Sequence, residues 1–372
     1  MTSIRASKIV TPEKVISNGV LVFDESTGLI TEISEDANFA ADITTDGILI
    51  PGFVDIHCHG GGGYSFDDIS NAASAAEFHL KHGTTSVLAS LVSAPVDIQI
   101  SLIKELSTLV EQDVIGGVHL EGPFLSSAKC GAQNPTVLTS PDGKSVNEII
   151  GASNGNLKMI TMAPELENAI SAIEVFAKSG VTVALGHSDA TSEFAIAGVE
   201  AGATVVTHLF NAMRPLHHRD SGLADVALTD SRLYVEVISD GKHVGDISIA
   251  LAHTAKKRQF LAVTDAISAA GMPDGEYKLG GLSVTCADDV AVIAGTKTLA
   301  GSTLNMERVF SRLTDVYNFD LIEASWATAT APANAIGLTD VGSIVVGKNC
   351  NIIVWNDGVK SVYKNGNLVH SN

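Results

Sequence analysis

The sequence predicts an α/β protein in which a closed barrel of parallel strands is accompanied by a small sheet built from both ends of the chain. Three observations predict it. Short apolar runs alternate with helical stretches through the middle, several of these runs end in a single metal-ligand type of residue, and both ends carry short β-rich runs. With 372 residues, 45% hydrophobic content and 34 glycines, the chain is long enough for one large barrel and a small accessory domain.

The two ends of the chain are predicted to form short strands separated by turns. These runs lie at 19–23 and 29–33, and at 342–347, 351–355 and 361–366. Because an isolated hairpin is marginally stable in water, we expect the two ends to pair into one small sheet. The expected domain boundaries are 1–49 and 340–372 for the small domain and 50–339 for the barrel.

The middle of the chain alternates strands with helices. Helices are predicted at 71–81, 98–111, 167–178 and 193–200, and each is followed by a glycine and then by the next apolar run. Such alternation predicts a parallel sheet, and this number of units favours closure into a barrel.

A pair of histidines, His57 and His59, lies in the segment 51–60, PGFVDIHCHG. Side chains alternate faces along a strand, so both imidazoles point the same way and would supply half of a tetrahedral metal shell. Taken alone, the pair is equally compatible with a solvated strand face.

Further apolar runs end in one residue that can bind a metal. These residues are Glu121, His187, His208 and Asp265. In a parallel barrel the carboxyl ends of the strands converge on one mouth, so all of them are expected to meet the histidine pair there.

Composition excludes several partners. A net charge of −19 argues against nucleic acid and anionic membranes. The first 13 residues contain no apolar targeting segment and no stretch is long enough to span a membrane, so a cytoplasmic protein is expected. The four cysteines are far apart and predict neither a disulfide framework nor a cysteine metal site.

One segment departs from the acidic background. Four of the six residues from Arg214 to Arg219 are cationic or can become so, and they closely follow His208. We interpret them as an anion site beside the metal; the alternative is a solvated basic loop.

Seven segments together carry a family resemblance. They are 51–60, 119–124 (HLEGPF), 186–188 (GHS), 207–213 (THLFNAM), 240–243 (DGKH), 263–266 (VTDA) and 299–302 (LAGS). Over essentially its whole length the chain resembles the N-acetylglucosamine-6-phosphate deacetylase family of the amidohydrolase superfamily.

The resemblance implies a (β/α)8 TIM-like barrel with a small β-sandwich from both termini. It also implies metal-dependent hydrolysis of the acetamide of N-acetylglucosamine 6-phosphate to glucosamine 6-phosphate and acetate. Glu121, His187 and His208 would hold the principal divalent ion, and His57 and His59 a second ion bridged by the carboxylate. One or two ions are therefore expected, with Zn2+ preferred and Fe2+, Mn2+ or Co2+ as alternatives.

The remaining expected site residues divide by role. Asp265 is the expected general acid/base and is also placed among the metal residues, while the resemblance implies that His243 polarises the acetyl carbonyl. The resemblance assigns the following residues to substrate binding: Ala132 and Gln133 near the sugar, Asn211, Ala212, His218 and Arg219 at the phosphate, and Leu299 and Ala300 closing over the ligand. Arg219 would reach the site of a neighbouring subunit, which implies a homodimer.

Two alternatives stay open. A related amidohydrolase acting on another N-acyl amino sugar, a cyclic amide or a nucleobase would keep the metal residues, but cyclic amides and nucleobases would not require the cationic cluster. A non-catalytic homologue that binds metal or sugar phosphate would have no need of Asp265 as a proton shuttle.

Overall fold

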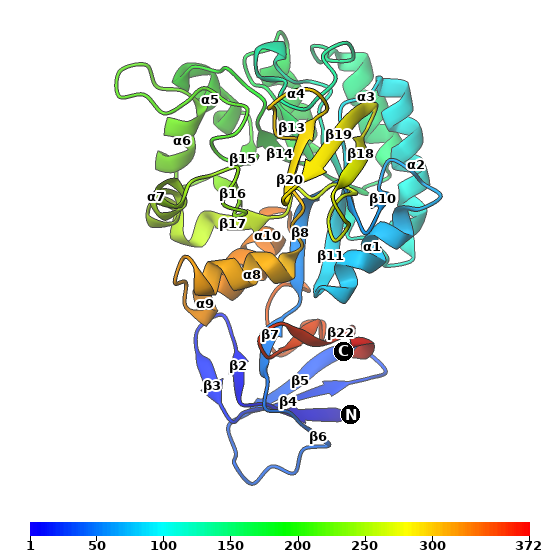
Figure 1. Ribbon diagram of the computed structural model, residues 1–372, viewed down its shortest axis with the longest axis vertical. Helices are drawn as coiled ribbons and strands as arrows, with labels where there is room; N and C mark the ends of the chain where they lie inside the picture. Colours follow the sequence, from blue (N-terminus) through cyan, green and yellow to red (C-terminus); the bar gives the residue numbers. More distant parts are fainter. The chain divides into compact units, whose positions relative to one another are not determined.

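The structure is a computed structural model that describes all 372 residues. Its central element is a ring of eight parallel strands (Figure 1). In order around the ring they are β8 (Phe53–Cys58), β11 (Thr84–Leu91), β12 (Gly117–Glu121), β13 (Leu157–Met162), β14 (Thr182–Leu185), β15 (Ala203–Val206), β16 (Tyr234–Ile238) and β17 (Phe260–Val263). The ring closes just beyond β17, where the N–H of Asp265 donates to the carbonyl of His57 across 2.8 Å and Ala266 bridges Cys58. The predicted (β/α)8 barrel is thus confirmed.

One α-helix connects each consecutive pair of barrel strands. These helices are α1 (Ala72–Lys81), α2 (Val96–Glu111), α3 (Gly143–Ser153), α4 (Ala169–Lys178), α5 (Ser192–Glu200), α6 (Leu223–Thr229) and α7 (Asp246–Lys256). The four helices predicted from sequence, α1, α2, α4 and α5, begin within two residues of the expected position and end at the expected residue. Gly83, Gly180 and Gly202 follow α1, α4 and α5 with positive φ, because a helix commonly ends where the chain turns left-handed, whereas Asp113 adopts that conformation after α2.

The terminal segments form two sheets whose facing sides share a core. One sheet holds β5 (Leu29–Ser34), β4 (Val20–Asp24), β1 (Thr2–Arg5) and β6 (Ile43–Thr44); the other holds β23 (Asn367–Ser371), β22 (Val359–Lys364), β21 (Ile352–Trp355), β7 (Ile48–Pro51), β2 (Lys8–Val10) and β3 (Val15–Ser17). Buried Ile4, Phe23, Leu49 and Ile352 belong to that core. Because β21 pairs with β7, both ends of the chain meet in one sheet, as expected (Figure 1).

The strand expected at 342–347 is wrong. The chain makes turns there, and Val345 and Val346 are exposed. The backbone of this segment is instead pinned at two points to β5, where Gly347 N–H donates to Ile30 and Ile30 N–H donates to Lys348. The buried residues of the run, Gly342, Ser343 and Ile344, are consecutive, so the segment lacks the alternating burial of a paired strand.

A three-stranded antiparallel sheet follows the barrel strands and was not expected from sequence. It comprises β18 (Gly275–Leu279), β19 (Leu282–Ala287) and β20 (Val290–Ile293). One face packs Val284 and Cys286 against Ile267 and Ala300. The sheet therefore fixes the turn that connects β20 to residue 301.

The chain folds into two compact units. One comprises Met1–Asp55, Glu77–Ser86 and Met306–Asn372, and the other comprises Ile56–Ala76 and Val87–Asn305. The first also contains α8 (Met306–Asp315), α9 (Leu321–Ser325) and α10 (Ala331–Ala335), and the second a short hairpin of β9 (Gly60–Gly61) and β10 (Tyr64–Ser65). None of the helices combines the length and apolar character needed to cross a bilayer. The domain boundaries expected near residues 49 and 339 stay a prediction.

Candidate metal centre and pocket

The residues expected to bind metal lie together at the carboxyl ends of the barrel strands. His57 is in β8, Glu121 is the last residue of β12, and the other members follow the ends of their strands by one or two residues. The complete cluster is His57, His59, Glu121, His187, His208 and Asp265, and every member is buried. The alternation of apolar strands with polar strand ends thus brings all six to one place.

Glu121 joins two histidine pairs. Its Oε1 atom lies 3.0 Å from Nε2 of His187 and 3.1 Å from Nε2 of His208. Its Oε2 atom lies 3.3 Å from Nε2 of His59, and the same carboxylate approaches Nε2 of His57 at 3.5 Å. Two groups of three ligand atoms therefore share one carboxylate.

Three of the four histidines are oriented so that Nε2 faces the cluster as a lone pair when the ring is neutral. In each case Nδ1 faces an oxygen that can only accept, so Nδ1 must carry the hydrogen. The acceptors are Glu236 for His57 at 2.9 Å, the Ser90 carbonyl for His59 at 3.1 Å and the Lys129 carbonyl for His187 at 2.9 Å.

This arrangement fits a divalent cation. Imidazole lone pairs and a carboxylate repel one another unless positive charge lies among them. Zinc–nitrogen bonds of about 2.0 to 2.1 Å place tetrahedral ligand atoms about 3.3 Å apart. The nitrogen atoms here are spaced accordingly, at 3.3 Å between His57 and His59 and 3.0 Å between His187 and His208.

The pKa values of two histidines also show that positive charge is favoured in the cluster. Burial lowers the pKa of His59, but hydrogen bonds to Asp265 and Glu121 outweigh it and raise that pKa to about 9. Burial likewise opposes charge on His57, yet Glu236 and Glu121 raise its pKa well above the usual value. Without a cation, protons on the rings balance the carboxylates; a divalent ion would take their place.

Strained backbone places three members of the cluster. His187, His208 and Asp265 have φ of 46°, 28° and 48°, in the left-handed region that residues with a side chain seldom occupy. Gly301, with φ of 63°, passes so close to Asp265 that a Cβ there would meet the Asp265 carbonyl at 2.7 Å. An unfavourable backbone conformation of this kind persists only where the surrounding structure enforces it, and such conformations cluster at functional sites.

A pocket of about 320 Å3 opens over the cluster. Its floor is formed by His59, Glu121, His187, His208 and Asp265. Its walls are formed by Gly131, Ala132, Gln133, Asn211, Ala212, Ile238, His243, Leu279, Lys297, Thr298, Leu299 and Gly301. A cavity of this size is sufficient for one small molecule such as a monosaccharide derivative.

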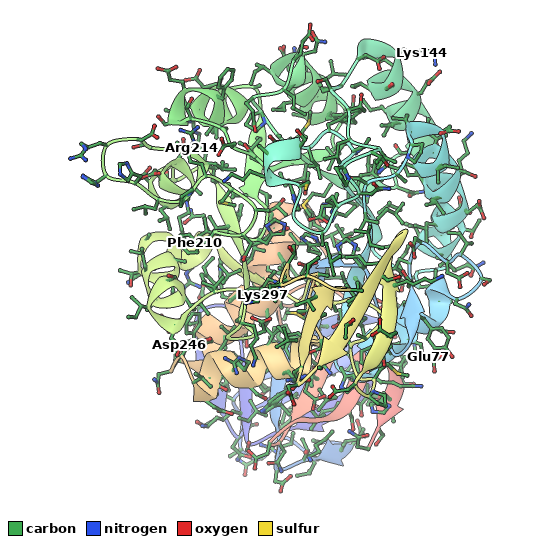
Figure 2. All side chains as sticks on the ribbon, turned by 45° about the horizontal axis from the view of Figure 1, so that its top comes forward. Glu77, Lys144, Phe210, Arg214, Asp246 and Lys297 are labelled. Atoms are coloured by element: carbon green, nitrogen blue, oxygen red, sulfur yellow. The ribbon has the colours of Figure 1, made fainter.

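The structure brings most of the expected substrate residues to this pocket. Ala132, Gln133, Asn211, Ala212, His243 and Leu299 line it. Ala300 does not, because it is buried against the three-stranded sheet. His218 and Arg219 are exposed on the loop between β15 and α6 and do not line the pocket of their own chain. Figure 2 labels Arg214 at this loop, away from Lys297.

Two polar wall residues are held by defined bonds. Gln133 donates from Nε2 to Glu121 Oε2 at 2.6 Å and accepts from the Ser93 N–H at 2.7 Å, so its amide fixes the central carboxylate. His243 donates from Nδ1 to Asp240 Oδ2 at 2.7 Å. Burial lowers the pKa of His243, but Asp240 raises it above the usual value.

Sequence reasoning missed Lys297 and Glu236. Lys297 is the one lysine or arginine that lines the pocket, and it lies in the turn after β20, near the centre of Figure 2. Its sequence context is an ordinary polar turn and gives no signal. Glu236 does give one, since a carboxylate in the middle of the apolar run YVEVI is unusual in a strand that belongs to a barrel.

Comparisons with known proteins agree with this geometry. Residues 48–369 match the model of the amidohydrolase family. N-acetylglucosamine-6-phosphate deacetylase of Danio rerio is 34% identical over 370 residues, covering 95% of this chain and 88% of the relative. N-acetylgalactosamine-6-phosphate deacetylase of Escherichia coli O157:H7 is 32% identical over 330 residues, covering 86% and 87%.

A solved structure extends the likeness to three dimensions. A variant of N-acetyl-D-glucosamine-6-phosphate deacetylase from Mycobacterium smegmatis, in complex with N-acetyl-D-glucosamine 6-phosphate, superposes with a TM-score of 0.95 at 34% identity. The alignment covers 100% of this chain and 99% of that one. The resemblance seen in the sequence is therefore confirmed, and the chain belongs to the amidohydrolase family.

Proposed function

We propose that this protein is a metal-dependent deacetylase that hydrolyses N-acetylglucosamine 6-phosphate to glucosamine 6-phosphate and acetate. The observation that carries the proposal is the convergence of four histidine Nε2 atoms on Glu121 at the floor of a sugar-sized pocket. The relative from Danio rerio and the superposed structure from Mycobacterium smegmatis are both named as deacetylases of N-acetylglucosamine 6-phosphate. In the reaction, water adds to the acetyl carbonyl and the C–N bond breaks, which leaves a free amine on the sugar.

Two metal positions are supported by the donor set. Glu121, His187 and His208 would hold one ion, and His57 and His59 a second one, with Glu121 shared between them. Zn2+ suits these nitrogen and oxygen donors, and Fe2+, Mn2+ or Co2+ use the same donor types. When bound, the metal polarises the acetyl carbonyl and lowers the pKa of water toward about 7.

Asp265 is the proposed general base and acid. Burial raises the pKa of this carboxyl, but the His57 and His59 rings lower it by more, so the group is ionised and able to accept a proton at neutral pH. Its Oδ1 atom lies 3.3 Å from Nε2 of His59, at the pocket floor. From there it would take a proton from the attacking water and deliver it to the amide nitrogen, which leaves only when protonated.

His243 is proposed to stabilise the negative charge that develops on the carbonyl oxygen. Its Nδ1–H is bound to Asp240, so Nε2 can donate a hydrogen bond only from the charged ring. The raised pKa of His243 favours that form. A charged donor in a shielded pocket is worth a few kcal/mol in the transition state, about 3 by analogy with oxyanion-hole donors.

The rest of the substrate is proposed to contact the pocket walls. Ala132 and Leu299 face the cavity beside the sugar, whereas Gln133 and Ala300 act by supporting Glu121 and the wall. The phosphate would be bound at Asn211 and Ala212.

A second copy of the chain would complete the phosphate site with His218 and Arg219. Both are exposed and lie outside the pocket of their own chain, yet arginine is the side chain best suited to bidentate phosphate binding. Apolar residues that a partner could cover lie on the same loop and on α7: Leu216 is 49% exposed, Ile247 is 88% exposed and Leu251 is 46% exposed. These features support a homodimer with shared active sites.

A second candidate substrate is N-acetylgalactosamine 6-phosphate. The relative from Escherichia coli O157:H7 is named for that sugar at an identity close to that of the glucosamine enzymes. The two sugars differ only in the orientation of one hydroxyl group, so the same metal centre serves either one.

The decisive experiment measures acetate release by the purified protein after chelation and after addition of Zn2+. N-acetylglucosamine 6-phosphate, its galactosamine isomer and unphosphorylated N-acetylglucosamine are compared. We expect metal-dependent release, fastest from the first, and a loss of about 10² to 10⁴-fold in kcat in Asp265→Asn with metal retained. Binding of the sugar phosphate without acetate release from any substrate would instead establish a non-catalytic homologue.

A further inference from the structure

Glu236 is a fully buried carboxylate in the middle of β16. Its neighbours along the strand, Val235 and Val237, are also fully buried. Removing a carboxylate from water is costly unless hydrogen-bond donors replace the lost hydration. The hydrogen-bond donors that contact Glu236 therefore indicate its role.

Both donors belong to residues of the metal cluster. The Nδ1–H of His57 donates to Oε2 of Glu236 at 2.9 Å, and the backbone N–H of His208 donates to the same oxygen at 3.1 Å. These histidines come from the two different pairs that share Glu121. The second oxygen, Oε1, is buried and has no hydrogen-bond partner.

We infer that Glu236 is a positioning residue that couples the two halves of the metal centre. The inference rests on the proposed metal centre and deepens it. A carboxylate accepts only, so it fixes hydrogen on Nδ1 of His57 and directs the Nε2 lone pair into the cluster. Its negative charge also makes that nitrogen a stronger ligand.

The bond to His208 serves the other half. His208 has φ of 28°, and such a backbone persists only when surrounding groups hold it. The bond from its N–H to Glu236 fixes the peptide from which the imidazole projects. One carboxylate oxygen therefore orients one ligand ring directly and another through its backbone.

Stability alone does not account for this side chain. A buried charge with one oxygen unpaired is less favourable than an apolar side chain of the same volume. Glu236 is useful because it orients proposed metal ligands. We therefore expect its loss to weaken metal binding.

The test compares Glu236→Gln and Glu236→Ala with a matched control, Thr161→Val. Thr161 is also fully buried on a barrel strand, but its hydroxyl bonds to His119 and Thr207 instead of to a proposed ligand. For each protein, the dissociation constants of Zn2+ are measured by competition with a chelator. The visible spectrum of the Co2+ form and the Tm of the metal-free form are recorded in parallel.

Glu236→Gln keeps the shape and one acceptor but loses the charge, and we expect it to weaken metal binding by about 10- to 100-fold. Glu236→Ala should weaken it at least as much and alter the Co2+ spectrum, while Thr161→Val binds metal as the native protein does. The inference is overturned if both Glu236 variants bind metal normally and only their Tm falls, or if Thr161→Val loses as much affinity as Glu236→Gln. If Glu236→Ala does not fold, the Gln variant decides.

Failure of the proposed function gives a different result. A native protein that binds metal in a Glu236-dependent way but releases no acetate would refute the deacetylase activity and leave the positioning role intact.

Discussion

Nδ1 of His243 donates to Oδ2 of Asp240 across 2.7 Å. Because of this bond, Nε2 of His243 can donate a hydrogen bond only when the ring is positively charged. With Nδ1–H bound to an acceptor, the neutral ring presents a lone pair at Nε2 and only the charged ring presents a second N–H. Burial lowers the pKa of His243, but Asp240 raises it above 6.5, which extends the charged form to higher pH.

Removing the charge of Asp240 should shift the pH profile. Asp240→Asn keeps an acceptor for Nδ1 but lowers the pKa of His243, so the high-pH fall in kcat should move to lower pH. The measurement is kcat across pH 5 to 10 with saturating substrate and Zn2+, and the control is Asp246→Asn, on the exposed first residue of α7. An unmoved high-pH limb in Asp240→Asn would show that catalysis does not use the charged ring.

Shared active sites predict complementation between inactive variants. If Arg219 acts in the partner's site, a mixed dimer of Arg219→Gln and Asp265→Asn contains one site with both native residues. Random pairing makes half of the dimers mixed, each with one of two sites intact, so co-expression should restore about a quarter of native activity. Homodimers of each variant expressed alone are the controls. Activity that does not rise on co-expression would place Arg219 in its own subunit's site or outside any site.

Lys297 should contribute to recognition of the phosphate. It is the one lysine or arginine in the pocket wall, and a dianionic group in an acidic protein gains from any cation within reach. Lys297→Gln should raise KM for the phosphorylated sugar several-fold, about 1 kcal/mol in binding, with kcat and the weak turnover of the unphosphorylated sugar unchanged. The matched control is Lys278→Gln. Lys278 lies on β18, in the sheet that carries the Lys297 turn, but it lines another cavity. A parallel rise in KM for both sugars would rule out a phosphate contact.

A pH-dependent contribution to stability is predicted for Glu307 in α8. Its carboxylate accepts from Nδ1 of His82 at 2.6 Å and from the N–H of Val359 at 2.9 Å. Burial raises the pKa of Glu307, but these bonds outweigh it and lower that pKa below 4.5. Because the folded-state pKa is depressed, the stabilisation is complete above pH 4.5 and disappears as pH falls through the lower value.

Glu307→Gln should therefore reduce the free energy of unfolding by about 1 to 3 kcal/mol at pH 6 and by less near pH 3, as measured by urea denaturation. Glu77→Gln is the control, since Glu77 pairs only with Lys81 on an exposed helix face and should change stability by less than about 0.5 kcal/mol. An equal loss at both pH values would mean that the ionised form of Glu307 is not what stabilises the fold.

The barrel and the metal cluster were predictable from the sequence because each ligand candidate follows an apolar run. His187, His208 and Asp265 carry this pattern individually, and barrel topology alone is enough to bring them together. Their left-handed backbone was not predictable, because it depends on bonds from other strands, such as that between His57 and Asp265.

Other features depend on contacts that no local pattern encodes. The sequence of β16 shows that Glu236 is unusual, but only the closed barrel shows that its donors are His57 and His208. Lys297 joins the pocket because the unexpected sheet of β18, β19 and β20 carries its turn there. At 342–347 an apolar run alone was insufficient to form a strand.

The backbone around Asp265 is locked on both sides, by the bond to His57 at 2.8 Å and by the bond from the N–H of Ser302 to its carbonyl at 2.7 Å. The outer wall of the pocket comes from connections between strands, around Ala132 and Leu299, and neither of these residues belongs to the metal cluster. Under the proposed function, mutation there would reshape the part that selects the sugar while the part that breaks the amide bond stays the same. Substitutions that exchange one amino-sugar phosphate for another would then fall in these connections and leave the metal cluster unchanged.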